Sequence, residues 1–284
     1  MAVLRLDRWN LAVGDAQPLM VIAGLNVLED LDLALEVGRH LQAVTSELGL
    51  PFIFKASFDK ANRSSAFSYR GPGLEAGLEM LAAVKAELKV PICTDLHEIA
   101  QAEPVAAVAD LVQIPAFLCR QTDFVIAAAK ATQAAGGLLH IKKGQFLAPG
   151  DCRSILDKIK DAIGEDRVIL CERGVSFGYN NLVVDMLAIP QMQELGAPVS
   201  IDATHAVQLP GAVTGANGAS TGGRRSGVPV IARAAVAAGA DAVFLEFHPD
   251  PDKAKCDGPS ALRLDAAAGL LKSLKALRDA LHAA

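Results

Sequence analysis

The feature that most constrains the fold is a series of eight short apolar segments with strand-like composition, which recur about every thirty residues. Stretches rich in Ala and Leu, with apolar residues at helical spacing, lie between them. This alternation predicts an α/β chain folded as a (β/α)₈ TIM barrel. An open doubly wound sheet is the alternative, but it would not need eight strands, and no GxGxxG motif follows the first segment. The eight segments are Met20–Ala23, Phe52–Lys55, Pro91–Asp95, Leu111–Ile114, Leu138–Lys142, Val168–Cys171, Val199–Asp202 and Ala242–Glu246.

We expect a single barrel domain over residues 1–284, because no linker or low-complexity tract divides the chain. Apolar residues on both sides of the polar turn Asp7–Asn10 predict an N-terminal β-hairpin that caps the bottom of the barrel. The most loop-like region is 211–227, which holds six glycines and follows the seventh strand. On a barrel this region lies at the catalytic face. The alternative is a disordered surface insertion.

The composition limits the function classes. A formal net charge of −5 argues against broad binding to nucleic acid or to an anionic membrane, so an anionic ligand has to be attracted by a local cluster of cations. The five cysteines are scattered without a CxxC pair, which suits a reducing compartment. Lys130 and Arg233 interrupt the longest apolar tracts, and no stretch resembles a signal peptide. We therefore expect a cytoplasmic protein with no membrane span.

The segment 55–65, KASFDKANRSS, directly follows the second apolar run and is rich in cations and hydrogen-bond donors. Such a cluster at the end of a strand is how an α/β enzyme builds an anion site. The alternative is a solvated, charged loop.

Polar or charged residues also follow the other strands, where a barrel gathers its catalytic groups. The cations expected to share this face can hold two phosphate-like groups, or a phosphate and a carboxylate. Arg120 is alternatively a surface arginine, and Lys143 is expected to point away because neighbours on a strand alternate faces. These strand-end residues are Asn26, Lys55, Lys60, Asn62, Arg63, Ser64, Asp95, His97, Gln113, Arg120, Lys142, Arg173, Asp202, His205, Glu246, His248 and Asp257.

A second constellation combines an imidazole with two carboxylates: His205, Glu246 and Asp257. These ligand types can hold a divalent metal ion. Each residue also has a plain structural interpretation: a hydrogen-bonded histidine, a partner for a buried cation, and a turn residue before Gly258 and Pro259.

Nearly the whole chain resembles the family of 3-deoxy-D-manno-octulosonate 8-phosphate synthases, also called 2-dehydro-3-deoxyphosphooctonate aldolases. The matching motifs are GLNVLED at 24–30, FKASFDKANRSS at 54–65, YRGPGLE at 69–75, TDLHE at 94–98, QIPAFLCRQTD at 113–123, KKGQF at 142–146, CERG at 171–174, FGYNNLVVDM at 177–186, DATHAVQ at 202–208 and EFHPDPDKAKCDGPSAL at 246–262. The resemblance implies condensation of phosphoenolpyruvate with D-arabinose 5-phosphate, on a (β/α)₈ barrel that assembles as a homotetramer. The product of that reaction is a precursor of the lipopolysaccharide inner core.

The resemblance also implies residue roles. Phosphoenolpyruvate is expected at Lys60, Gln113, Lys142 and Arg173, with Lys55 and Ser57 close by. The pentose phosphate is expected at Asn62, Arg63 and Ser64, with Arg120 reaching it from a neighbouring subunit. The expected catalytic groups are Asn26, Lys60, Asp95, His205, Glu246 and Asp257.

The family has metal-dependent and metal-independent classes, and the metal-dependent class has a cysteine where this chain has Asn26. An amide is a much poorer ligand than a thiolate for a soft or borderline divalent metal ion. We therefore expect the metal-independent class and no cofactor. The rival hypotheses are the related enzyme that condenses phosphoenolpyruvate with erythrose 4-phosphate, and a barrel that binds sugar phosphates without catalysis. The KANRSS segment favours the pentose enzyme over the first.

Overall fold

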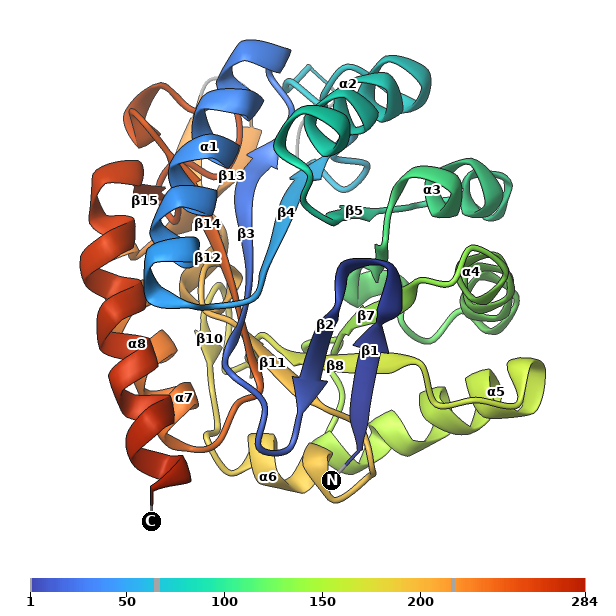
Figure 1. The fold of residues 1–284 in the computed structure, drawn as a ribbon. Coiled ribbons are helices and arrows are strands. Elements are labelled where there is room, and N and C mark those ends of the chain that lie inside the picture. The colour runs from blue at the N-terminus through green and yellow to red at the C-terminus, as the bar shows by residue number, and fades with distance from the viewer. Residues whose placement is uncertain (1, 64–66, 216–217, 284) are drawn as a thin grey trace.

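A closed barrel of eight parallel strands forms the centre of the molecule, in a computed structural model that describes residues 2–63, 67–215 and 218–283 (Figure 1). Neighbouring strands pair in chain order, and pairing of β11 with β14 closes the barrel. The predicted (β/α)₈ fold is confirmed, and each predicted segment overlaps one strand. The strands are β3 (Met20–Val27), β4 (Phe52–Ser57), β5 (Ile92–Asp95), β6 (Leu111–Ile114), β7 (Leu138–Lys142), β8 (Val168–Glu172), β11 (Val199–Asp202) and β14 (Ala242–His248).

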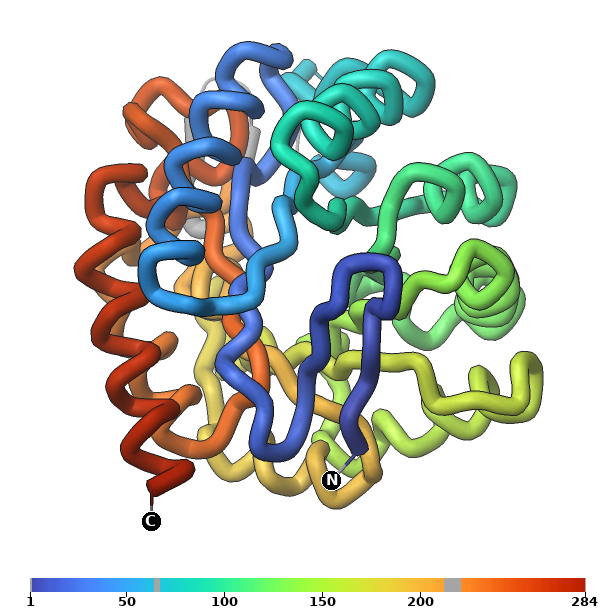
Figure 2. Tube along the Cα trace, viewed as in Figure 1, coloured from blue at the N-terminus to red at the C-terminus, as the bar shows by residue number. Residues whose placement is uncertain are grey.

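Helices surround the barrel, as the tube along the chain shows (Figure 2). The helix α1 illustrates how the sequence sets their ends: the Asp30 side chain accepts a hydrogen bond from the Leu33 amide at 2.8 Å, and Gly49 ends the helix in the left-handed conformation. The helices are α1 (Leu31–Leu48), α2 (Leu74–Leu88), α3 (Ala102–Val108), α4 (Thr122–Ala134), α5 (Arg153–Ile163), α6 (Ala188–Gln193), α7 (Val228–Ala237) and α8 (Ala267–His282).

The N-terminal hairpin covers the end of the barrel where the strands begin. Its antiparallel strands β1 (Val3–Leu6) and β2 (Leu11–Gly14) contribute Leu6 and Val13 to an apolar cluster inside the barrel. The other members of this cluster are Met20, Ile22, Ile53, Cys93, Leu111, Leu138, Ile169, Ala242 and Phe244. Because most of these residues stand at or near the beginning of their strands, the hairpin closes the barrel bottom, as predicted.

The first two barrel strands approach each other too closely for a side chain at Gly24. A β-carbon there would lie 2.0 Å from the backbone oxygen of Lys55. Only glycine fits this position, since a contact this short cannot be relieved by moving a flexible side chain. The approach brings the end of β3, which carries Asn26, beside Lys55 on β4.

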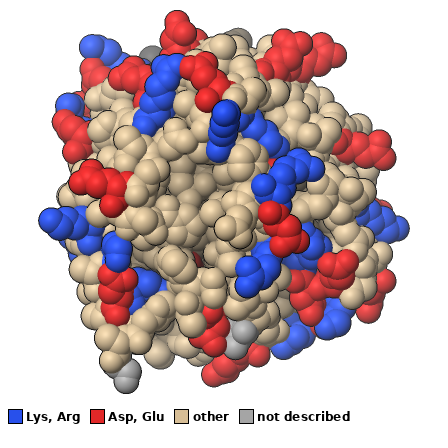
Figure 3. Space-filling view, in the orientation of Figure 1, with Lys and Arg blue, Asp and Glu red and all other residues tan. Residues whose placement is uncertain are grey.

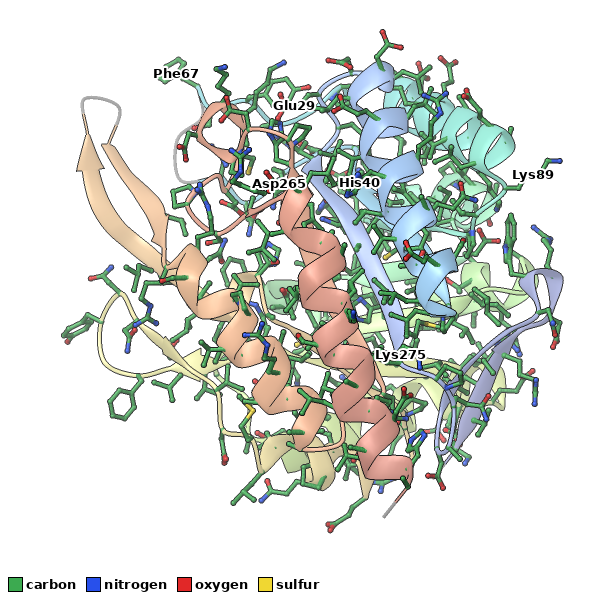
Figure 4. All side chains as sticks on the ribbon, turned by 60° about the vertical axis from the view of Figure 1, so that its left-hand side comes forward. Glu29, His40, Phe67, Lys89, Asp265 and Lys275 are labelled. Carbon is green, nitrogen blue, oxygen red and sulfur yellow. The ribbon has the colours of Figure 1, made fainter. Side chains whose placement is uncertain are left out.

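The glycine-rich segment after the seventh strand is a hairpin, so the expectation of a loop over 211–227 is wrong for much of its length. Strands β12 (Gln208–Gly215) and β13 (Gly218–Gly223) pair antiparallel with a register shift between Leu209 and Val213. Glycine permits the tight backbone approach at the base of the hairpin, where a β-carbon on Gly223 would lie 2.2 Å from Oγ of Ser260. Figure 4 shows the hairpin standing away from the barrel.

The remaining strands are short pairings outside the barrel: β9 (Val175–Ser176) with β10 (Leu182–Val183), and β15 (Leu262–Arg263) beside β14. On the face seen in Figure 3, basic and acidic side chains are interspersed around a largely uncharged centre. None of the helices in the described parts of the chain is both long and apolar enough to cross a membrane.

Candidate active site

A cavity of about 1130 Å³ opens at the end of the barrel where the strands finish. Residues from several strand ends and from the loop at 251–259 line it. Three further predicted residues, Asn26, Ser57 and Glu246, are buried close to its floor. The predicted residues that line the cavity are Lys55, Lys60, Asn62, Arg63, Asp95, His97, Gln113, Lys142, Arg173, Asp202, His205 and Asp257.

Lys60, Ser57 and Asp95 form a buried chain on one side of the cavity. Lys60 Nζ donates to Ser57 Oγ at 3.0 Å, and Ser57 donates to Asp95 in a short hydrogen bond. The other oxygen of Asp95 lies 3.1 Å from Nε2 of His97. Burial alone would raise the pKa of Asp95, but Lys60 and His97 outweigh it and hold the pKa well below the ordinary value. Asp95 is therefore an ionised acceptor.

The pKa of Lys60 changes in the opposite direction. Burial alone would lower it, but the carboxylates of Asp95 and Glu246 raise it above the ordinary value of a lysine. Lys60 thus keeps its positive charge in a place that excludes most water, where a charge acts more strongly on a bound anion.

Across the cavity, Asp202 links Lys142 to His205. Lys142 Nζ forms a short ion pair with Asp202, and Nδ1 of His205 lies 2.8 Å from the same carboxylate. Although burial would raise the pKa of Asp202, His205 and Lys142 hold it well below the ordinary value. Lys142 also stands over the ring of Phe244, 3.3 Å from its centroid. The ring thus forms an aromatic floor under the lysine.

Glu246 is fully buried and is the carboxylate that Lys55 neutralises. Lys55 Nζ donates to Oε1 of Glu246 at 2.8 Å and to the backbone oxygen of Asn26 at 3.0 Å. Burial would raise the pKa of Glu246, but Lys55, His205 and Lys60 together lower it to about 2. Because these acceptors already bind its amine, Lys55 mainly positions the residues of the cavity floor and is less available to bind an anionic ligand.

The candidate metal ligands His205, Glu246 and Asp257 do converge, but Asn26 occupies the space between the two carboxylates. Its Nδ2 donates to Glu246 Oε2 at 2.6 Å and to Asp257 Oδ2 at 3.2 Å. Asn26 thus directs its amino group, which is not a metal ligand, toward the two carboxylates. The absence of a metal ion stays a prediction, and these hydrogen bonds agree with it because they use carboxylate oxygens that a cation would need.

His205 faces both of these carboxylates from the other side. Its Nε2 lies 3.8 Å from Glu246 Oε2 and 3.7 Å from Asp257 Oδ2. Across the described ranges of the chain, no three or more His, Cys, Asp or Glu side chains are grouped so that they could hold a metal ion.

Arg173 and Gln208 complete the wall between the two clusters. Arg173 Nη2 donates to Gln208 Oε1 at 3.2 Å, and Gln208 Nε2 donates to Asp257 Oδ2 at 2.9 Å. The Nη1 group of Arg173 is buried and has no hydrogen-bond partner in the parts of the chain that the structure describes. A buried guanidinium with an unused donor indicates an anionic ligand at this point of the cavity.

From the segment KANRSS, Ala61, Asn62 and Arg63 line the outer part of the cavity. Asn62 is exposed, and Arg63 is partly buried with its Nη1 against the sulfur of Cys256. Burial raises the pKa of the Cys256 thiol to about 12, so this cysteine is neutral beside the arginine. Ser64 lies outside the described residues.

Two cations that follow barrel strands do not line the cavity. Arg120 is exposed and donates to Ser154 Oγ at 2.7 Å, so counting it with the cations of its own chain's site is wrong. Its predicted action across a subunit interface stays a prediction. Lys143 is fully buried outside the cavity, where it lies 3.4 Å from Glu172 Oε2, in agreement with the expected alternation.

Asp202 and His97 were predicted at strand ends but were given no role. Two further residues of this site, Phe244 and Gln208, were not among the candidates, which were selected by their position at the end of a strand. Phe244 lies within β14, and Gln208 begins β12, so neither carried such a signal. Their roles depend on which side chains meet across the barrel.

Comparison with known proteins adds to this geometry. A sequence model of the DAHP synthetase I family matches residues 3–283. The chain is 53% identical over 272 residues to the 2-dehydro-3-deoxyphosphooctonate aldolase of Desulfosudis oleivorans, covering 95% of this chain and 94% of that protein. The proteins of the same name from Cupriavidus taiwanensis and Shewanella denitrificans are 54% identical over 270 residues and 51% identical over 279 residues. These alignments cover 93% and 98% of this chain, and 91% and 94% of the relatives. The chain therefore belongs to the DAHP synthetase I family and, within it, to the 2-dehydro-3-deoxyphosphooctonate aldolases.

Proposed function

We propose that this protein condenses phosphoenolpyruvate with D-arabinose 5-phosphate and water, giving 3-deoxy-D-manno-octulosonate 8-phosphate and inorganic phosphate. The observation that carries the proposal is the identity of 51–54% to aldolases of this name over more than nine tenths of the chain. The cavity supports it, because it combines buried cations for one anion with a less buried pair, Asn62 and Arg63, for a second.

Phosphoenolpyruvate binds in the deeper part of the cavity, between Lys60, Lys142 and Arg173. All three side chains are nearly buried, so their charges are little screened by water. Gln113 lies at the same depth and supplies a neutral polar group. This set neutralises a phosphate and a carboxylate together and fixes the enol between two walls of the barrel.

The pentose phosphate lies nearer the entrance of the cavity, where Asn62 and Arg63 hold its phosphate group. Ser64 follows these two residues in the sequence and belongs to the same proposed site. We include Arg120 of a neighbouring subunit at this phosphate, within a homotetramer. The side chain of Arg120 is exposed in the single chain, as this role requires.

The carbon–carbon bond forms when the methylene carbon of the enol attacks the aldehyde carbon of the pentose. The aldehyde oxygen gains negative charge and then a proton, and cations already in place stabilise that charge. Water adds to the carbon that carries the phosphate ester, and the carbon–oxygen bond to phosphate breaks. Asp95 and His205 face the cavity from opposite sides and orient the aldehyde and the water.

The reaction needs no metal ion in this chain. The support is the pair of hydrogen bonds from Asn26 to Glu246 and Asp257, which occupy the carboxylates that a cation would otherwise bind. Turnover is expected to survive EDTA, and its loss on chelation with recovery on added manganese or zinc would overturn this assignment.

We place the enzyme in the cytoplasm, in the synthesis of the lipopolysaccharide inner core. The local clusters of cations, against a formal net charge of −5, suit small phosphorylated substrates better than nucleic acid.

Phosphate release from purified protein tests the proposal. With phosphoenolpyruvate, arabinose 5-phosphate should release phosphate at least about a hundredfold faster than erythrose 4-phosphate does. The two sugars differ by one carbon, and the length of the chain determines whether the phosphate group reaches Arg63. The family match makes the erythrose enzyme the specific rival, and the reverse preference would establish it. Binding of both substrates without phosphate release would instead support the hypothesis of a barrel that binds sugar phosphates without catalysis.

A further inference from the structure

Directly beneath the cavity, three side chains form a buried polar row: Gln113 on β6, His140 on the adjacent β7, and Ser200 on β11, which is separated from β7 by β8. Gln113 and His140 are opposite one another in the pairing of β6 with β7. The Gln113 amide lines the cavity, whereas His140 and Ser200 are fully buried below it. The ring of His140 stacks on Phe244 at 5.9 Å with an interplanar angle of 19°. Only Gln113 of the three can contact a ligand.

The direction of each hydrogen bond in this row depends on which of its polar atoms carry a hydrogen. Nδ1 of His140 lies 3.3 Å from Oε1 of Gln113, and an amide oxygen only accepts, so Nδ1 carries the hydrogen. Burial, with Lys142 nearby, holds the pKa of His140 well below the ordinary value, so the ring is neutral. Its Nε2 is then an acceptor, which Ser200 Oγ satisfies at 2.8 Å by donating its single hydrogen.

If the hydrogen bonds of the row ran in the opposite direction, the oxygen and the amino group of the Gln113 amide would exchange places. The Ser200 hydroxyl also lies 3.2 Å from the backbone oxygen of Leu170. If its hydrogen went there, Nε2 of His140 would have to donate and Nδ1 would have to accept. The ring would then require the amino group of Gln113, whose carbonyl oxygen would face the cavity and repel an anion. The structure places Oε1 of Gln113, and not Nε2, against Nδ1 of His140, which corresponds to the first arrangement.

From this row we infer that His140 is a positioning residue: its Nδ1–H holds the Gln113 carbonyl and thereby turns the Gln113 amino group toward the anion in the cavity. The inference rests on the proposed function and deepens it, since it assigns Gln113 as a donor to phosphoenolpyruvate. Among the described residues, nothing accepts a hydrogen bond from Nε2 of Gln113, so this group is available to a ligand.

The test is the affinity for phosphoenolpyruvate, measured by calorimetry on the whole protein. His140→Leu removes the donor but keeps the volume, and Ser200 can still donate to Leu170. The dissociation constant should rise about tenfold, the effect of one hydrogen bond to a charged ligand. The KM for arabinose 5-phosphate should change by less than about twofold, because only the deeper anion site is altered. His140→Asn retains an N–H near the position of Nδ1 and should restore most of the affinity.

A double-mutant cycle separates positioning from a structural role. In a Gln113→Leu background, His140→Leu should have no further effect on the dissociation constant for phosphoenolpyruvate. Equal losses with and without Gln113 would overturn the inference, as would an Nε2–H tautomer of His140 in the nitrogen-15 spectrum of the histidine-labelled protein. If the wild-type protein binds no phosphoenolpyruvate, the proposed function itself fails; if it binds and turns over while the cycle is additive, only this inference fails.

Discussion

The lower and upper layers of the barrel interior come from the same strands but have opposite chemistry. Below lies a cluster of aliphatic residues closed by the N-terminal hairpin, in which Ile53 and Ile169 are fully buried. Above, strands of the same barrel present Lys55, Lys142 and Asp95, which are almost as deeply buried. The lower layer gains stability simply by excluding water. Each charge in the upper layer instead needs a specific partner, because an unpaired buried charge is strongly unfavourable.

The boundary between the layers is an aromatic ring with polar groups around it. Phe244 belongs to the apolar cluster, yet Lys142 lies 3.3 Å and Lys55 5.2 Å from its centroid. His140 stacks on the same ring. The ring therefore completes the core and also favours the two ammonium groups that stand over it. Phe244 therefore belongs to both layers, because it packs in the apolar cluster and also contacts the lysines above it.

The largest effect should come from removing one partner of a buried ion pair in the upper layer. Lys55→Met leaves the carboxylate of Glu246 without its cation and should lower the free energy of unfolding by about 4 kcal/mol. Urea unfolding measures it. Adding Glu246→Gln to this variant should recover part of the loss, and a double variant less stable than the single one would contradict the argument.

Lys142→Met should act mainly on catalysis. It removes a cation from the proposed phosphoenolpyruvate site, and kcat/KM should fall by two to three orders of magnitude, about 3–4 kcal/mol in transition-state stabilisation. Steady-state kinetics with phosphate detection give the value. The partly exposed Lys275 on α8, which pairs with Asp279 outside the cavity, offers a matched control, since Lys275→Met should leave kcat/KM unchanged (Figure 4). A Lys142→Met enzyme with full activity would remove this lysine from the site.

Acid should weaken the upper layer selectively. The pKa of Glu246 is lowered from the ordinary 4.5 to about 2 in the folded protein, so its contribution is fully present above pH 4.5 and is lost as the pH falls toward 2. The loss amounts to roughly 3 kcal/mol. Unfolding measured across this range should show a shallower pH dependence in Glu246→Gln. An unchanged slope in that variant would show that Asp95 and Asp202, whose pKa values are also lowered, account for the whole effect.

The smallest effect should come from trimming the lower layer. Ile169→Val removes one buried methylene group and should reduce the free energy of unfolding by about 1 kcal/mol. Neither KM should change, because Ile169 does not line the cavity. A change in substrate affinity would show that the two layers are mechanically coupled, contrary to the separation described above.

The sequence predicted the strands of this barrel well because each is a short apolar run that ends in polar residues. Lys142 and Lys143 show how far the pattern reaches: strand alternation alone indicated that one faces the cavity and the other does not. The hairpin at Gln208–Gly223 was missed because glycine-rich segments lack the alternating apolar pattern that identifies strands. Its two strands are recognised from their backbone pairing.

The partners of the charged residues could not be predicted in the same way. Lys55 and Glu246 are 191 positions apart in the sequence. Asn26, on a third strand, donates hydrogen bonds to the carboxylates of Glu246 and Asp257. No local pattern specifies such contacts, because they depend on how the barrel closes. Arg120 illustrates the same limit: its strand-end position suggested a cavity cation, but its side chain points to Ser154 on the outside.

Periodicity and composition act locally along the chain, so they were sufficient to predict the barrel, the hairpin beneath it and the end of the barrel that carries the chemistry. The folded structure was needed to show which charges are paired, which way Asn26 and Gln113 orient their amides, and that two lysines stand over Phe244. These properties follow from distances between different strands, and the free energy of a buried charge or hydrogen bond depends on those distances.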